Sequence, residues 1–204
     1  MMLGMARPVV HDAALRDRLM DAATSAIERD GAEGLVLREL AAECGTSTSA
    51  VYALFGGKPQ LLAAGVAHAL ASFGSAQRDA APQGLRALGI AYRAWALTHP
   101  TLYGMMFGSA STSAQATCTP DGQPDVGELA MVPLREAVAA AQRAGVMTDV
   151  PLEIAAAAIW GQVHGLVSLQ LAGISPTGLD WDAAYDCVLD TVARSWSAPA
   201  GGVE

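Results

Sequence analysis

The stretch Leu37–Lys58, LRELAAECGTSTSAVYALFGGK, decides the fold of the first part of this chain. Leu37, Leu40 and Ala41 follow the i, i+3, i+4 spacing of one helical face, and charged residues take other positions. Cys44-Gly45 ends that helix, because glycine accepts the left-handed backbone that closes a helix. The hydroxyl side chains that follow can cap a second helix. The stretch therefore predicts two short helices joined by a tight turn, which is the layout of a helix-turn-helix.

The second predicted helix has one apolar face and one small, polar face. Val51, Leu54 and Phe55 share the apolar stripe. The residues outside the stripe can contact base edges, a thymine methyl group or phosphates: Thr48, Ser49, Tyr52 and Ala53. Two amphipathic helices with such a turn also occur in many all-α proteins, so the spacing by itself leaves a DNA-reading and a purely structural interpretation open.

The residues on both sides of this stretch resemble the amino-terminal domain of the tetracycline-repressor (TetR) family of transcriptional regulators. The resemblance spans roughly residues 12 to 66 and is carried by Arg38-Glu39-Leu40-Ala41, Gly45-Thr46-Ser47, Tyr52 with Phe55, and Lys58 with Leu61-Leu62. It implies that the second helix is a recognition helix. It also implies a set of DNA-binding residues: Thr46, Ser47, Thr48, Ser49 and Ala53 facing the groove, Tyr52 and Lys58 on phosphates, and Arg38 beside them.

Three positions depart from the usual pattern of the family. Val36 stands where a capping threonine is common, Thr46 where valine is common, and Leu54 where histidine is frequent. A missing capping hydroxyl costs about 0.5–2 kcal/mol of helix stability. These departures leave the fold in place but change the set of contacts that the second helix can make.

Composition favours a folded, all-α protein. The chain has 204 residues, 52% of them hydrophobic, and carries a net charge of −8. Residues 1–60 hold six basic and eight acidic side chains, so the first part of the chain is the less acidic part without being a basic patch. Non-specific DNA affinity should therefore be weak and salt-sensitive, and tight binding would need a dimer that docks two recognition helices.

Several other classes of protein and site find no support in the residues. Cys44, Cys118 and Cys187 lack the spacing of a zinc site or disulfide framework, and we expect them to be buried as small hydrophobes. The four histidines lie far apart, and no Gly-x-Ser-x-Gly elbow occurs. Ile154–Ala172, the most apolar segment, is interrupted or flanked by polar residues. We therefore expect a cytoplasmic protein without a membrane segment, metal, cofactor or enzymatic activity.

The pattern predicts a helix-turn-helix domain over 11–57, a connecting helix over 58–78 and a second helical domain over 84–197. In the second domain His99-Pro100 ends one helix, because the residue before a proline avoids helical angles. Residues 108–124 contain no periodic pattern, and we expect a loop that is either a functional lid or disordered. Pro133 either starts or kinks the helix that follows.

The second domain holds aromatic and sulfur-containing side chains that could line an apolar ligand site. The candidates are Tyr92, Trp95, Tyr103, Met106, Phe107, Met131, Trp160 and His164. Such residues also fill ordinary cores, and His164 could equally be a hydrogen-bonded core residue. Thr98–Tyr103 and Trp160–Gly165 resemble a subgroup of the same family that has a Trp-x-x-x-His-Gly element in its sensor domain.

Two long helices are predicted at the carboxy-terminal end, the second starting at the capping residue Asp180. In the resembling family the last two long helices form a four-helix dimer interface. The resemblance therefore implies a dimer interface that contains Gly161, Gly165, Ser168, Ala172, Tyr185, Val188 and Val192. Packing of these residues within the chain is the alternative.

The leading hypothesis is a dimeric, ligand-responsive transcriptional regulator, most simply a repressor. It would hold two recognition helices about one DNA turn apart, roughly 34–36 Å, on a palindromic double-stranded operator. An apolar or aromatic small-molecule effector in the second domain would release it. A helical ligand-binding or scaffold protein without specific DNA binding is the alternative, and the acidic charge and Leu54 keep it open.

Overall fold

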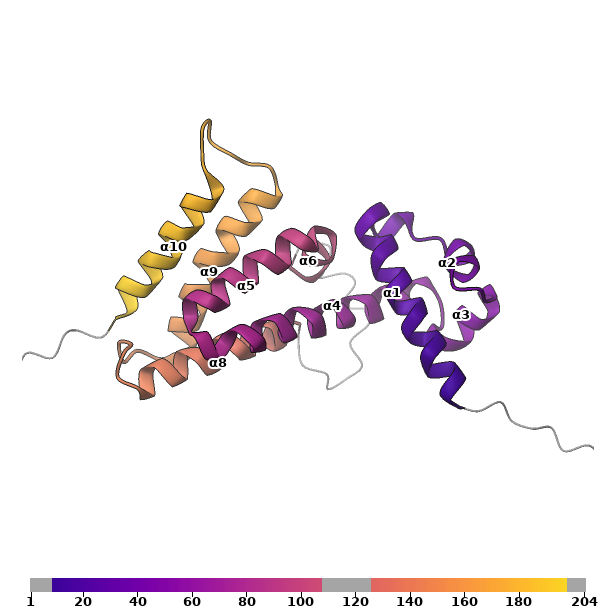
Figure 1. The fold of residues 1–204 in the computed structure, drawn as a ribbon, viewed down its shortest axis with the longest axis horizontal. Helices are drawn as coiled ribbons and strands as arrows, with labels where there is room; N and C mark the ends of the chain where they lie inside the picture. Colours follow the sequence, from indigo (N-terminus) through magenta and orange to yellow (C-terminus); the bar gives the residue numbers. More distant parts are fainter. Residues whose placement is uncertain (1–8, 108–125, 198–204) are drawn as a thin grey trace, which may run out of the picture. The chain divides into compact units, whose positions relative to one another are not determined.

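The computed structural model describes residues 9–107 and 126–197. Within these ranges the chain is helical, with one antiparallel bridge between Met147 and Ser197. The helices, labelled in Figure 1, are α1 (Val9–Gly34), α2 (Leu37–Glu43), α3 (Thr48–Phe55), α4 (Lys58–Ala80), η1 (Ala81–Gln83), α5 (Leu85–Thr98), α6 (Pro100–Phe107), α8 (Val126–Arg143), α9 (Leu152–Leu171) and α10 (Trp181–Trp196). The all-α prediction is confirmed.

The chain divides into two compact units, and the division falls inside α4. The first unit contains the described residues up to Leu70 together with Thr101–Phe107. The second unit contains Ala71–Pro100 and the described residues from Val126 onwards. Helix α6 therefore groups with the amino-terminal helices rather than with α5, which directly precedes it.

The first unit is built around α1, which contacts both α2 and α3 (Figure 1). Its core side chains Leu19, Ile27, Val51 and Leu61 are fully buried. Helix α6 is joined to α1 by hydrogen bonds, because the Glu28 carboxylate accepts the backbone N–H groups of Thr101 and Leu102 at 3.0 and 2.9 Å. Those groups lie in the first turn of α6, where N–H groups have no partner inside the helix.

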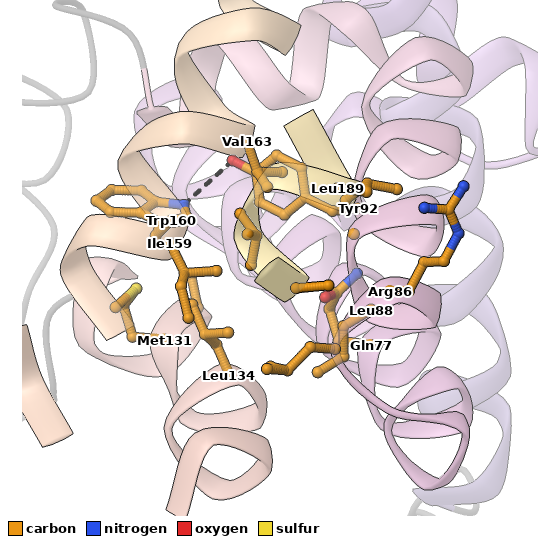
Figure 2. Close-up of a pocket in the computed structure, with 15 residues that line it drawn as sticks. Gln77, Arg86, Leu88, Tyr92, Met131, Leu134, Ile159, Trp160, Val163 and Leu189 are labelled. Atoms are coloured by element: carbon orange, nitrogen blue, oxygen red, sulfur yellow. Dashed lines mark hydrogen bonds between the residues drawn. The ribbon is translucent and has the colours of Figure 1, made fainter. Parts of the chain in front are cut away.

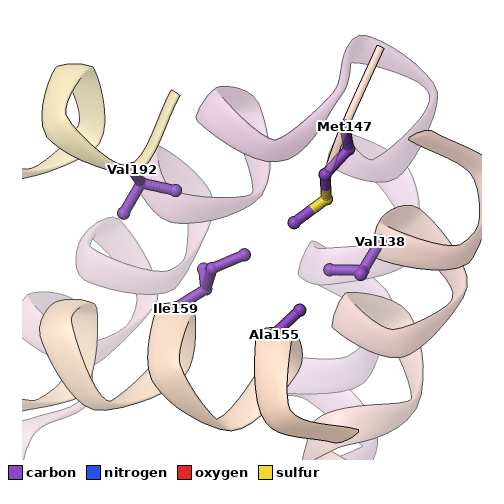
Figure 3. Close-up of a cluster of buried hydrophobic side chains, with 5 residues drawn as sticks. All are labelled: Val138, Met147, Ala155, Ile159 and Val192. Atoms are coloured by element: carbon purple, nitrogen blue, oxygen red, sulfur yellow. The ribbon is translucent and has the colours of Figure 1, made fainter. Parts of the chain in front are cut away.

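The second unit has α9 at its centre, in contact with α5, α8 and α10. Figure 3 shows a cluster of buried apolar side chains from α8, α9, α10 and the segment after α8: Val138, Met147, Ala155, Ile159 and Val192. Ion pairs join neighbouring helices at the surface, with Arg93 of α5 on Asp182 of α10 at 2.7 Å and Arg135 of α8 on Glu153 of α9 at 2.8 Å.

The helix ends predicted at Gly45 and Asp180 are found in the structure. Glycine at a positive φ follows α2 and α8, at Gly45 (64°) and Gly145 (69°), and Asp180 caps α10 by accepting two backbone N–H groups. Pro133 lies inside α8 and does not start it. The predicted loop over 108–124 lies outside the described residues, as does Cys118.

The prediction that the cysteines are buried is wrong for Cys187, which is exposed on α10. Cys44 is half-buried, and its thiol donates to the Arg18 carbonyl at 3.6 Å. Burial, and then the neighbouring Glu43 carboxylate, raise the pKa of the Cys44 thiol. Cys44 is therefore held in its unreactive protonated form.

One described helix, α9, is long and apolar enough to span a membrane by length and composition. Five of its side chains are buried against neighbouring helices: Ala155, Ala156, Ile159, Val163 and Val167. The core helix of a globular unit has the same composition, so this feature is weak evidence for a membrane segment.

Candidate functional site

The turn between α2 and α3 is fixed by local chemistry. Gly45 takes the left-handed conformation that ends α2. Ser47 then caps α3, since its hydroxyl oxygen accepts the backbone N–H of Ala50 at 3.2 Å. Gly56, with φ 88°, closes α3 at its other end. Because α3 has defined ends and buries Val51 and Phe55, its remaining face has a fixed orientation in the first unit.

The face of α3 that points away from the core is small and polar. Tyr52 is 55% exposed, and Ser49 and Ala53 are also exposed. Thr46 and Thr48 are half-buried at the start of the helix, and Arg38 is exposed on α2. The structure therefore brings the predicted DNA-binding residues of α2, the turn and α3 into one unit, with hydroxyl groups and one cation in reach of solvent.

Two basic side chains tie α3 and its following turn to α1. The Arg16 guanidinium lies over the Phe55 ring, 4.5 Å from its centroid, and donates to the Leu54 carbonyl at 2.7 Å. Lys58 donates to the Glu33 carbonyl near the end of α1 at 2.9 Å. The Lys58 ammonium is thus held beside the end of α3. Val36, at the cap position of α2, makes no side-chain capping bond.

The second unit contains a pocket between α4, α5, α8, α9 and α10 (Figure 2). It has a volume of about 600 Å³ including the space at its open mouth. Carbon atoms make up most of its wall. The lining residues are Gln77, Leu85, Arg86, Leu88, Gly89, Tyr92, Ala130, Met131, Leu134, Ile159, Trp160, Val163, Leu189, Val192 and Ala193.

A hydrogen-bonded chain of side chains stands at one wall of the pocket. The Trp160 indole donates to the Tyr92 hydroxyl at 3.3 Å, drawn dashed in Figure 2. The Tyr92 hydroxyl is 2.9 Å from His164 Nδ1, and His164 Nε2 is 3.3 Å from the Ser168 hydroxyl. Burial lowers the pKa of His164, which favours the neutral ring. When the neutral ring carries its proton on Nε2, Nδ1 accepts from the Tyr92 hydroxyl and the Nε2–H group donates to the Ser168 hydroxyl.

Two further polar side chains line the pocket, and they differ in their partners. Arg86 pairs with Asp186 at 2.7 Å and with Asp190 at 2.5 Å, so two carboxylates neutralise its charge. Gln77 is only 5% exposed, and its Nε2 atom has no hydrogen-bond partner. Leaving a buried donor unpaired costs about 1–3 kcal/mol. Gln77 is therefore the polar group that a bound molecule could satisfy.

Some of the residues predicted to bind a ligand line the pocket, and others lie elsewhere in the structure. Tyr92, Met131 and Trp160 line the pocket, and His164 lies behind Tyr92. Trp95 packs instead against Phe73, with ring centroids 5.3 Å apart, and donates to the Ser72 hydroxyl. The three candidates on α6 belong to the first unit and are not among the lining residues: Tyr103, Met106 and Phe107.

The two polar lining residues, Gln77 and Arg86, were not among the predicted site residues. For Gln77 a signal exists in the sequence, because it follows Phe73 by four residues and therefore falls on the buried stripe of α4. A lone amide on an apolar stripe is the mark of a buried polar group. Among the described residues no group of acidic, histidine and cysteine side chains could hold a metal ion.

The predicted dimer residues also separate into two groups. On α9, Gly161 and Ala172 are exposed, Gly165 and Ser168 are half-buried, and a methyl group added at Gly161 or Gly165 would meet no atom within 4 Å. On α10, Tyr185 and Val192 are buried inside the second unit, and Val188 is half-buried. The Tyr185 hydroxyl donates to the Gly89 carbonyl at 2.7 Å, so this side chain packs α10 against α5.

Comparison with solved structures shows the same fold over most of the chain. A protein of unknown function from Rhodococcus sp. RHA1 is 26% identical, with a TM-score of 0.74 over 96% of this chain and 100% of that one. A TetR family transcription regulator from Marinobacter aquaeolei VT8 is 20% identical, with a TM-score of 0.64 over 93% and 99%. RolR, solved in complex with the ligand resorcinol, is 16% identical, with a TM-score of 0.59 over 95% and 92%. No curated protein matches the chain.

Two family models match the chain, one for each part of it. Residues 19–64 match the bacterial regulatory proteins of the tetR family, and these residues include α2, α3 and the turn between them. Residues 85–192 match the tetracyclin repressor-like C-terminal domain, which contains most of the pocket wall. More than half of the sequence is covered, and so this chain belongs to the TetR family of ligand-responsive, DNA-binding transcription regulators.

Proposed function

We propose that this protein is a repressor that leaves its operator when an apolar, in particular an aromatic, small molecule occupies the pocket of the second unit. The observation that carries the proposal is the carbon-lined pocket, which opens between five helices and holds Tyr92 and Trp160 in its wall. Apolar pockets with a few well-placed polar groups are the usual form of small-molecule sites.

The DNA side of the proposal rests on α3. Thr46, Thr48, Ser49 and Ala53 are the groove-facing candidates, and Tyr52 and Lys58 are the phosphate contacts, with Ser47 serving at the same time as the cap of α3. Hydroxyl groups read base edges or bind phosphate, and the Tyr52 ring carries its hydroxyl out into solvent. The protein would act on DNA in the cytoplasm.

We further propose a homodimer that uses α9. Its open side presents Gly161, Gly165 and Ala172, with Leu169 44% exposed beside them. Small side chains allow two helices to approach closely. A net charge of −8 makes DNA binding by a single recognition helix weak, so tight binding needs a dimer with two of them. Gly161→Arg should give a monomer by light scattering after gel filtration, because a Cβ added at Gly161 meets no atom of the subunit within 4 Å and the guanidinium would lie in the proposed interface.

Helix α4 is the segment of chain that joins the end of α3 to the pocket wall. Helix α4 starts at Lys58, directly after the turn that ends α3, and carries Gln77 into the pocket wall. A ligand that binds one position of α4 more tightly than another shifts the balance between the two by that difference in affinity. Release from DNA then follows from movement of a single helix.

Fluorescence anisotropy with labelled DNA from upstream of the protein's own gene tests the proposal. Specific binding should appear at low salt and weaken steadily as salt rises, since bound phosphates release counterions. A scrambled sequence of equal length is the control. Equal affinity for both sequences, or no binding at the lowest salt, would favour the alternative of a helical ligand-binding or scaffold protein.

A further inference from the structure

We infer that Gln77 is the polar anchor of the effector, and that the effector is an uncharged, largely apolar molecule with one hydrogen-bond acceptor, such as a cyclic ketone or an ester. This inference rests on the proposed function, because it names the chemical class of the molecule that the same pocket takes. It goes further in assigning the donor that selects that class.

The other polar side chains in the pocket wall already have hydrogen-bond or ion-pair partners. The Trp160 N–H is used by the Tyr92 hydroxyl, and that hydroxyl is also bonded to His164. Arg86 is held by two carboxylates of α10. Among the described lining residues, the Gln77 Nε2 atom is the buried polar side-chain atom that has no hydrogen-bond partner.

Gln77 lies in the pocket wall, where a bound molecule would meet its amide group. Figure 2 shows its amide end directed toward the same space as Tyr92 and Leu189, and its 5% exposure leaves water little access to it. Gln77 lines the pocket, so a rotation of its side chain lets a bound molecule place an acceptor atom on Nε2 while its carbon skeleton covers Leu134 and Ile159. The donor has no partner before binding, so no hydrogen bond within the protein is broken when the molecule binds.

The charged side chains of the pocket wall determine whether the bound molecule can carry a charge. An anion would need a free cation, and Arg86 is already neutralised by Asp186 and Asp190. A cation would need a carboxylate, and none belongs to the described lining residues. Burying an uncompensated charge costs far more than burying a carbonyl group that is hydrogen-bonded. An uncharged molecule with a single acceptor fits this wall.

The test uses the full-length protein and three probes of similar size: 1-indanone, indane and benzoate. Indanone and indane share a skeleton and differ in the carbonyl acceptor. Isothermal titration calorimetry should show indanone bound about tenfold more tightly than indane, the effect of one buried hydrogen bond of about 1.4 kcal/mol. Benzoate should bind more weakly than indane.

Gln77→Met is the diagnostic variant, because methionine has a similar length and no donor. It should remove the preference for indanone over indane and leave indane affinity unchanged. It should also raise the melting temperature of the ligand-free protein, because an unpaired buried amide is replaced by an apolar group of similar shape. Gln83→Met, at an exposed glutamine in η1, is the matched control and should change neither quantity.

The inference is overturned if wild-type protein binds indanone and indane equally, if Gln77→Met keeps the preference, if benzoate binds best, or if no probe binds up to its solubility limit. None of these measurements contains DNA. Failure of the proposed function would instead appear as probe binding with the predicted preference but without any change in DNA affinity, so the two failures can be told apart.

Discussion

The polar groups of the candidate DNA-binding surface in the first unit face outward, whereas those of the candidate ligand site in the second unit line a pocket. On α3 the hydroxyl of Tyr52 and the side chain of Ser49 face solvent, in a position to meet a charged polymer. Around the pocket, Tyr92 and Gln77 are buried among carbon atoms, in a position to meet the small, uncharged molecule that we infer. One protein chain can therefore recognise two chemically opposite partners, because each partner meets a unit with its own core.

Loss of Phe73 should show the largest effect, because this side chain supports the pocket wall. It is 1% exposed and packs edge-on against Tyr92 and Trp95, with both ring centroids 5.3 Å away. Phe73→Ala should lower the free energy of unfolding by about 3–5 kcal/mol, measured by chemical denaturation. Leu97→Ala, at an exposed position of α5, should change it little. Similar losses in the two variants would contradict the assigned core.

Two substitutions at the outward-facing surface should weaken DNA binding in different ways, each by about 1–3 kcal/mol or less. Lys58→Ala should reduce affinity for every sequence alike and make binding less dependent on salt, while Lys58→Arg should retain most of it. Thr48→Ala should change the preferred base at one position of each half-site. Anisotropy with single-base variants of the operator measures both. If Thr48→Ala acts uniformly on all sequences, the groove-facing side of α3 is assigned wrongly.

The caps of α2 and α3 offer a matched pair of substitutions in opposite directions. Ser47→Ala removes the bond to the Ala50 N–H and should destabilise the protein by about 0.5–2 kcal/mol. Val36→Thr adds a hydroxyl at a cap position that lacks one and has extended backbone, and should stabilise it by about 0.5–1 kcal/mol. Thermal denaturation measures both effects. Unchanged stability in Ser47→Ala would show that the cap contributes nothing.

The smallest predicted effect is a dependence of protein stability on pH, and it comes from His164 in the second unit. Burial lowers the pKa of His164 below its ordinary value of 6.5, so below about pH 6.5 the unfolded chain binds a proton that the folded chain resists. Stability should be complete above that pH and decrease as the pH falls below it. His164→Gln should remove this part of the pH dependence in denaturation curves, and His68→Gln, at an exposed site, should not. Identical profiles for wild type and His164→Gln would contradict the account.

The first unit follows from the sequence because its rules are local. A glycine at position 45, a cap at Ser47 and an apolar stripe through Val51 and Phe55 act over a few residues, and each is found as predicted. The pocket is different. Gln77 and Leu189 meet there from helices far apart in the sequence, and only tertiary packing decides that Tyr92 lines the wall while Trp95, three residues later, fills the core.

The predicted dimer-interface residues meet the same difficulty, because the sequence does not reveal contacts between distant helices. The small residues of α9 and the aromatic face of α10 both need a partner, and the sequence does not say which partner each receives. In the structure Leu189 lies against Gly89, where an added methyl group would overlap it, and Tyr185 bonds to the same glycine. Helix α5 of the same subunit therefore covers this face of α10, while Gly161 stays open on α9.

The most direct test of the central claim is a titration of the protein–DNA complex with 1-indanone, followed by anisotropy of labelled DNA from upstream of its own gene. We predict that wild type releases the DNA as indanone saturates the pocket, and that Gln77→Met needs about tenfold more indanone for the same release. DNA that stays bound while calorimetry shows the pocket filled, or release at the same concentration from both proteins, would contradict it.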